Sequence, residues 1–131
     1  MLERVTGIGG IFWRSENPPE LARWYRDVLG IDTYSDEDNG VWWQQAGPTV
    51  VSPFAADTDY FGRMDQGSML NFRVRNLDAM LDQLRDAGAT VLPDTQLMEG
   101  VGRFGWAEDP EGNRFELWEP TAEAMREPGA R

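Results

Sequence analysis

The sequence of 131 residues contains no cysteine, no histidine and no lysine, and all 12 of its basic residues are arginine. Without cysteine the chain has no disulfide framework, no thiolate nucleophile and no zinc–thiolate site. Without histidine or lysine it cannot form a Ser-His-Asp triad, use imidazole as an acid or base, or form a lysine Schiff base. Proton transfer or metal binding would therefore depend on Asp, Glu, Tyr, Ser and Thr side chains.

Negative charge dominates the chain, since 23 acidic residues give a formal net charge of −11. Such a surface repels phosphates, so we expect no nucleic-acid partner. No apolar run approaches the ~18 residues that a membrane span needs, and the start Met1-Leu2-Glu3-Arg4 lacks a signal pattern. We therefore expect a cytoplasmic protein without a membrane partner. Its hydrophobic content of 40%, with 6 Trp, suffices for the core of a single domain.

An internal repeat organises the chain, because residues 10–17 and 69–76 follow the same pattern at an offset of 59. Both segments alternate with period two, which predicts a strand, and both end in asparagine, a good helix N-cap. The matched pairs are Ile11 with Leu70, Trp13 with Phe72, Arg14 with Arg73, and Asn17 with Asn76. After each asparagine, apolar residues recur at helical spacing until Gly30 in the first copy and Gly88 in the second.

Short candidate strands follow each predicted helix, and two acidic, glycine-containing segments, residues 36–40 and 109–113, predict hairpin turns. The expected strands are Ile31–Ser35, Gly40–Gln45 and Thr49–Pro53 in the first copy, and Thr90–Leu92, Gly102–Glu108 and Asn113–Glu119 in the second. The pattern predicts an α+β fold of two tandem βαβββ modules that form one curved mixed sheet around a concave cavity. The predicted single domain spans residues 1–120, with modules at about 4–62 and 66–120, a connection at Ala55–Gln66, and a flexible tail at 121–131.

Three stretches, Trp24–Gly30, Phe72–Asp78 and Asp109–Pro120, resemble the vicinal oxygen chelate superfamily, which includes glyoxalase I, bleomycin-resistance proteins and extradiol dioxygenases. The resemblance covers residues 4–120 and implies the same fold. In the family's metalloenzymes four side chains hold a divalent metal ion. The matching positions here are Gly10, a position near Val50–Ser52, Met69 and Glu116. Only Glu116 is a competent ligand, so we expect no metal or other cofactor.

Strand alternation separates the side chains that pack under the helices from those that face the cavity. The first group contains Ile11, Trp13, Leu70, Phe72, Phe115 and Leu117. The predicted ligand-binding residues are Phe12, Arg14, Trp42, Met69, Asn71, Arg73, Phe104, Trp106 and Trp118. Two choices stay open: Trp43 could take the place of Trp42, and either Phe104 or Trp106 could face the cavity. Such a mixture of aromatic walls and few polar groups is typical of a small-molecule pocket, although the tryptophans could equally belong to the core or to a dimer interface.

Glu116 has two interpretations: a functional carboxylate that acts as a base or weak metal ligand, or a buried carboxylate paired with Arg14 or Arg73. We consider three functions. The first is metal-independent binding of a small aromatic or cationic molecule. The second is a lyase, isomerase or dioxygenase-like enzyme that uses Glu116, which an Asn71 or Tyr side chain within reach of the carboxylate would favour. The third is a partner domain without a ligand. Aromatic residues on both strand faces, together with the resemblance, also predict a homodimer.

Overall fold

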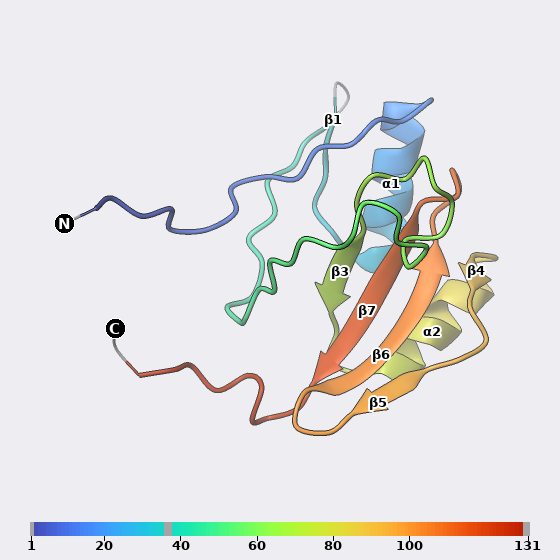
Figure 1. The fold of residues 1–131 in the computed structure, drawn as a ribbon. Helices are drawn as coiled ribbons and strands as arrows, with labels where there is room; N and C mark the ends of the chain where they lie inside the picture. The colour runs from blue at the N-terminus through green and yellow to red at the C-terminus, as the bar shows by residue number, and fades with distance from the viewer. Residues whose placement is uncertain (1, 36–37, 130–131) are drawn as a thin grey trace.

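The computed structural model describes residues 2–35 and 38–129. Over these ranges it contains two helices and seven strands in a mixed α+β arrangement (Figure 1). The elements are α1 (Pro18–Leu29), β1 (Tyr34–Ser35), β2 (Asp38–Asn39), β3 (Leu70–Arg73), α2 (Leu77–Asp86), β4 (Thr90–Val91), β5 (Gln96–Met98), β6 (Gly102–Glu108) and β7 (Arg114–Pro120).

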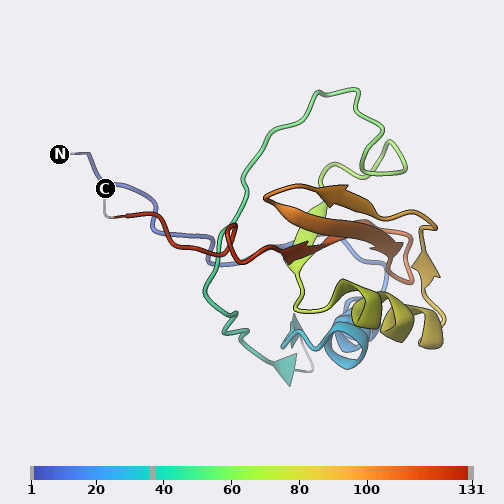
Figure 2. The ribbon, with the colours of Figure 1, turned by 90° about the horizontal axis from the view of Figure 1, so that it is seen from below.

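The main sheet has five strands in the order β3-β7-β6-β4, with β5 also pairing with β6. Strands β3 and β7 are parallel, and the other pairs in this sheet are antiparallel. Figure 2 shows that the sheet is curved, that α1 and α2 lie on one face, and that the chain between the two repeats passes over the opposite face. The predicted α+β class with a curved mixed sheet is confirmed.

Local signals define both helices as the sequence predicts. The Asn17 side chain accepts a hydrogen bond from the Glu20 amide at 3.3 Å, and the Asn76 side chain accepts one from the Ala79 amide at 3.0 Å. These side chains satisfy backbone N–H groups that have no partner within the helix. After α1, Gly30 adopts the left-handed conformation with φ of 72°, which stops the helix because residues with a Cβ rarely adopt it.

The core lies between the helices and the main sheet. Its fully enclosed members are Leu77, Leu81, Leu84, Ala107, Phe115 and Leu117. The first-repeat helix α1 joins this core, since the rings of Trp24 and Tyr25 both lie 6.2 Å from the ring of Phe115. The predicted packing of Leu70, Phe72, Phe115 and Leu117 toward the helices is confirmed. The helix of the first repeat is therefore buried against the sheet of the second.

The strands predicted for the first repeat differ from the structure. Residues 10–14, Gly40–Gln45 and Thr49–Pro53 lie outside any helix or strand, and the strand expected at Ile31–Ser35 is reduced to β1. A strand needs hydrogen bonds to a neighbouring chain segment, which alternation alone does not supply. Asp36 and Glu37 of the predicted turn lie outside the described residues, but the flanking β1 and β2 pair antiparallel. In the second repeat, the sequence missed β5.

Two further predictions concern the ends of the chain and membranes. Residue Thr121 donates its backbone N–H to Val101 at 3.1 Å and accepts from Met125 at 3.1 Å, so the start of the predicted tail forms a turn against the sheet. Within the described ranges, no helix combines the length and the apolar character required to cross a membrane.

Candidate functional site

The candidate site is centred on Glu116, in the middle of β7. The sheet register places Asn71 of β3 beside Glu116 on one side and Trp106 of β6 beside it on the other. Because Phe115 and Leu117 point toward the helices, alternation directs Glu116 and its two neighbours to the opposite face. Three adjacent strands thus bring a carboxylate, an amide and an indole together on the face without helices.

Each oxygen of the half-buried Glu116 carboxylate accepts hydrogen bonds. Oε1 accepts from the Asn71 amide nitrogen at 2.7 Å. Oε2 accepts from the Trp106 indole nitrogen at 3.1 Å and from the Tyr60 hydroxyl. No arginine is among these partners, and Arg73 instead donates to the backbone carbonyls of Pro48 and Gln45. The predicted pairing of Glu116 with Arg14 or Arg73 is therefore wrong.

Tyr60 extends the site from the connection between the repeats. Its burial and its hydrogen bond to Glu116 raise the pKa of the Tyr60 hydroxyl from 10.0 to about 12. A phenol with this pKa stays protonated at neutral pH, so Tyr60 acts as a hydrogen-bond donor to the carboxylate. The Tyr60 ring stacks on Phe54 at 5.5 Å and meets the Trp106 ring edge-on at 6.2 Å. These contacts hold Tyr60 over the sheet.

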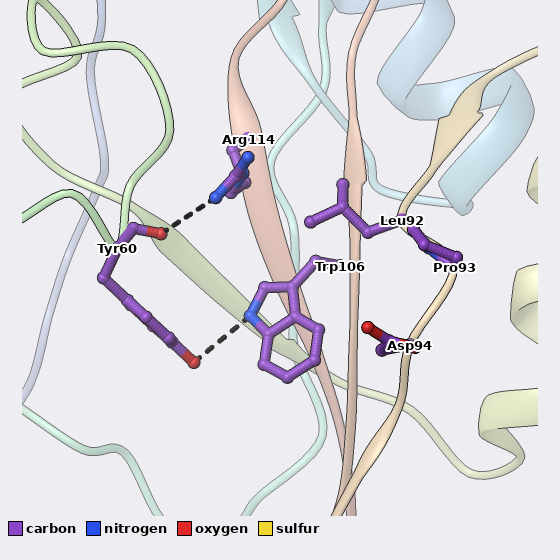
Figure 3. Close-up of a pocket in the computed structure, with 6 residues that line it drawn as sticks. All are labelled: Tyr60, Leu92, Pro93, Asp94, Trp106 and Arg114. Atoms are coloured by element: carbon purple, nitrogen blue, oxygen red, sulfur yellow. Dashed lines mark hydrogen bonds between the residues drawn. The ribbon is translucent and has the colours of Figure 1, made fainter.

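A pocket of about 240 Å³ adjoins this hydrogen-bonded group. It is lined by Tyr60, Leu92, Pro93, Asp94, Trp106 and Arg114 (Figure 3). Two of these residues, Tyr60 and Trp106, donate hydrogen bonds to Glu116 Oε2, so the carboxylate helps to fix the position of two aromatic walls of the pocket. Arg114 approaches the pocket from the start of β7 and donates to the Tyr60 carbonyl at 3.3 Å. The pocket is thus aromatic and aliphatic, with one cation and one carboxylate.

The structure brings only some of the predicted site residues together. Asn71 and Trp106 contact Glu116, and Trp106 also lines the pocket. Trp118 is 5% exposed, stacks on Phe104 at 6.0 Å and donates to the Val101 carbonyl, so it is enclosed by the sheet rather than presented to the pocket. The remaining candidates, all outside the pocket lining, are Gly10, Phe12, Arg14, Trp42, Met69, Arg73 and Phe104.

Sequence reasoning missed five of the six residues that line the pocket, all except Trp106. Leu92, Pro93 and Asp94 follow β4, and Tyr60 belongs to the connection between the repeats. One signal for Tyr60 was present: two adjacent aromatic residues, Tyr60 and Phe61, stand in a connection that also contains several acidic residues. Side chains of that kind in a connection indicate that it packs on the protein.

The donors around Glu116 do not fit a divalent metal ion. An indole N–H, an amide NH₂ and a phenol O–H all direct hydrogen atoms at the carboxylate, and a cation would have to displace them. In the described parts of the chain, no three His, Cys, Asp or Glu side chains gather where they could hold a metal ion. The carboxylate is arranged to receive hydrogen bonds.

Comparisons with known proteins agree with this geometry at the level of fold. Residues 10–118 match the model of a family described as a glyoxalase-like domain. No curated protein sequence matches the chain.

Several solved structures share the fold. TnmS3, described as an antibiotic binding protein from Streptomyces sp. CB03234, is 21% identical, with 92% of this chain and 100% of that chain covered and a TM-score of 0.56. The fosfomycin resistance protein FosX from Listeria monocytogenes is 16% identical, with 93% and 97% covered and a TM-score of 0.60. An integron cassette protein from the mobile metagenome of V. cholerae is 18% identical, with 92% and 100% covered and a TM-score of 0.59.

Proposed function

Because the chain belongs to the glyoxalase-like domain family, we propose that it binds a small aromatic molecule, without a metal ion, in the pocket beside Glu116. The observation that carries this proposal is the pair of aromatic walls, Tyr60 and Trp106, both hydrogen-bonded to the same carboxylate oxygen. Side chains that are already fixed lose little freedom when a ligand binds, which favours affinity. A flat ring packs well against an indole and a phenol.

The relatives provide context for this proposal. TnmS3 is described as an antibiotic binding protein and FosX as a fosfomycin resistance protein. This fold therefore accommodates proteins associated with small molecules, but it hosts many chemistries, so the function must be argued from the site. Here the aromatic walls of the pocket and its few polar groups support binding.

Tryptophan fluorescence tests the proposal with untagged protein, since a histidine tag would supply metal ligands that the chain lacks. Titration with a panel of planar aromatic compounds should quench emission, and treatment with EDTA should leave the dissociation constants unchanged. Trp106→Ala should weaken binding at least tenfold. Trp43→Ala is the matched control, because that indole is 91% exposed and lies outside the pocket lining. Equal affinity in the Trp106→Ala variant would contradict the proposed pocket, and a stoichiometric metal in the purified protein would contradict metal independence.

A homodimer and a cytoplasmic location are also part of the proposal. Exposed aromatic side chains support the dimer, since Phe12 is 94% and Trp43 is 91% exposed in segments outside any strand. Sedimentation equilibrium should give twice the chain mass of 14.9 kDa. A monomer at micromolar concentration would contradict this part.

A second candidate function is an enzyme in which Glu116 acts as a general base. The observation that favours it is the contact of Glu116 with Tyr60 and Asn71, because a carboxylate beside a phenol and an amide can remove a proton while the neighbours stabilise developing charge. Bound aromatic compounds with acidic C–H groups should then exchange hydrogen for deuterium in D₂O, and Glu116→Gln should abolish the exchange. Exchange at the rate of free solution would contradict this candidate.

A further inference from the structure

Arg114 brings an unneutralised positive charge to the pocket. A guanidinium group has five N–H donors, yet in residues 2–35 and 38–129 the structure gives it a single acceptor, the Tyr60 carbonyl at 3.3 Å from Nη1. Its Nε is the one buried side-chain nitrogen or oxygen in these ranges without a hydrogen-bond partner. No carboxylate oxygen of the described residues forms an ion pair with it within 4.0 Å.

The surrounding chain holds this guanidinium in place. The Gln66 side chain forms two hydrogen bonds with the Arg114 backbone: it accepts from the Arg114 N–H at 2.8 Å and donates to the Arg114 carbonyl at 2.8 Å. Gly62 closes over the side chain, and a Cβ atom at Gly62 would lie 3.2 Å from Arg114 Nε. The positive charge is therefore fixed at the wall of the pocket, beside Tyr60 (Figure 3).

We propose that the ligand is an aromatic anion, whose carboxylate or similar anionic oxygen binds Arg114 while its ring packs against Tyr60 and Trp106. This inference rests on the proposed function, because it uses the same pocket. An arginine fork matches a carboxylate in geometry and forms charge-assisted hydrogen bonds about twice as strong as neutral ones. The buried Nε is enclosed beneath Gly62, so the donors that a ligand oxygen can reach are the terminal N–H groups, of which only Nη1 has an acceptor among the described residues.

Arg114 acts on a bound ligand at shorter range than the net charge of the whole chain does. The net charge of −11 favours cations only at distances where salt screens the interaction, since the Debye length is about 8 Å at physiological ionic strength. Contact with Arg114 acts at hydrogen-bond distance and escapes this screening. Asp94 is exposed and lies beyond Trp106 from Arg114 (Figure 3), so its carboxylate can turn into solvent. Inside the pocket, contact with Arg114 therefore opposes the preference for a cation that the overall charge suggests.

Calorimetry with three matched probes at pH 7 tests the inference: 2-naphthoate, 2-naphthamide and 2-naphthylmethylammonium. Naphthoate should bind about tenfold more tightly than the neutral amide, and the ammonium compound should bind most weakly. Arg114→Gln should bring naphthoate to the affinity of the amide while leaving the amide unchanged. Arg85→Gln is the control, because this arginine is exposed on α2, pairs with Asp82 and should leave all three constants unchanged.

The outcomes separate the two proposals. If the amide or the ammonium compound binds as tightly as naphthoate, or if folded Arg114→Gln keeps the preference for naphthoate, the anion preference is refuted while aromatic binding stands. If none of the three probes binds, the proposed function itself fails. Circular dichroism verifies the fold of Arg114→Gln, and if it does not fold, the comparison of the three probes on the unaltered protein decides.

Discussion

Replacement of Glu116 by glutamine or by leucine should affect stability very differently. Glutamine can keep its amide oxygen toward Tyr60 and Trp106 while its NH₂ group faces Asn71. Asn71 is exposed, so its own amide can rotate by half a turn and present its oxygen to that NH₂ group. All the hydrogen bonds are then retained, and the cost of Glu116→Gln should stay below about 0.5 kcal/mol.

Leucine removes both carboxylate oxygens, so Tyr60 loses its acceptor and the Trp106 indole N–H keeps only the Tyr60 hydroxyl oxygen at 3.2 Å. The Tyr60 and Trp106 donors are half-buried, and losing an acceptor costs about 1 kcal/mol for each, whereas exposed Asn71 can turn to water. We therefore expect Glu116→Leu to lower the free energy of unfolding by about 2 kcal/mol. For 131 residues the entropy of unfolding is about 0.28 kcal/mol per kelvin, so Tm should fall by about 7 °C, against less than about 2 °C for glutamine.

Urea unfolding followed by tryptophan fluorescence, together with calorimetric Tm values, measures both effects. Glu99→Gln provides a control for loss of a carboxylate, since Glu99 is exposed and is not among the residues that line the pocket. If Glu116→Gln costs as much as Glu116→Leu, the amide cannot replace the carboxylate and the hydrogen-bond exchange described above is refuted. If neither costs more than the control, the three donors do not stabilise the fold.

Three other perturbations test separate parts of the structure. Tyr25→Phe removes the hydroxyl that donates to buried Asp109 at 2.7 Å, which should cost about 1.5–3 kcal/mol in urea unfolding, and a loss under 0.5 kcal/mol would contradict the role of this bond. Because the Tyr60 pKa is raised to about 12, the protonated hydroxyl stabilises the fold below pH 10, and this contribution is lost as pH rises through about 12. Tyr60 should therefore stay protonated from about pH 9 to pH 11, so the 295 nm absorbance change over this range should be the same in Tyr60→Phe. For Glu111, burial raises the pKa, but hydrogen bonds from the Ser15 hydroxyl and from two backbone amides have the larger combined effect, so the pKa is lowered. Its contribution is therefore present at neutral pH and lost in acid, so Glu111→Gln should differ from the unaltered protein in Tm at pH 7 and converge with it as pH falls.

The second repeat could be predicted from the sequence because its signals are local and mutually consistent. Asn76 caps α2, the apolar stripe of α2 matches the alternating β3 and β7, and the sheet register follows. The placement of Asn71 and Glu116 on one face is a direct result of that alternation. Here the pattern carried enough information to predict two members of the site.

The first repeat shows where such reasoning stops. Residues 10–14 alternate as β3 does, yet they form no strand, because pairing requires a neighbour that alternation does not specify. Tyr60 was missed for a related reason, since a connection is positioned by contacts with distant residues such as Trp106 and Glu116. Arg114 lies near the start of a predicted strand, but its N–H donors without acceptors, which point to a role in binding, are visible only in the folded structure.

The burial of α1 against β7 has a consequence for biosynthesis. Tyr25 and its partner Phe115 are separated by 90 positions, so the apolar side of α1 leaves the ribosome long before the surface that covers it is translated. During this interval Leu21 and Tyr25 stay exposed on the nascent chain, and the helix cannot be stabilised by packing until β7 emerges. Completion of the fold is therefore deferred until β7 has been translated, and a protein truncated before Phe115 would be a substrate for chaperones and proteases rather than a smaller version of the domain.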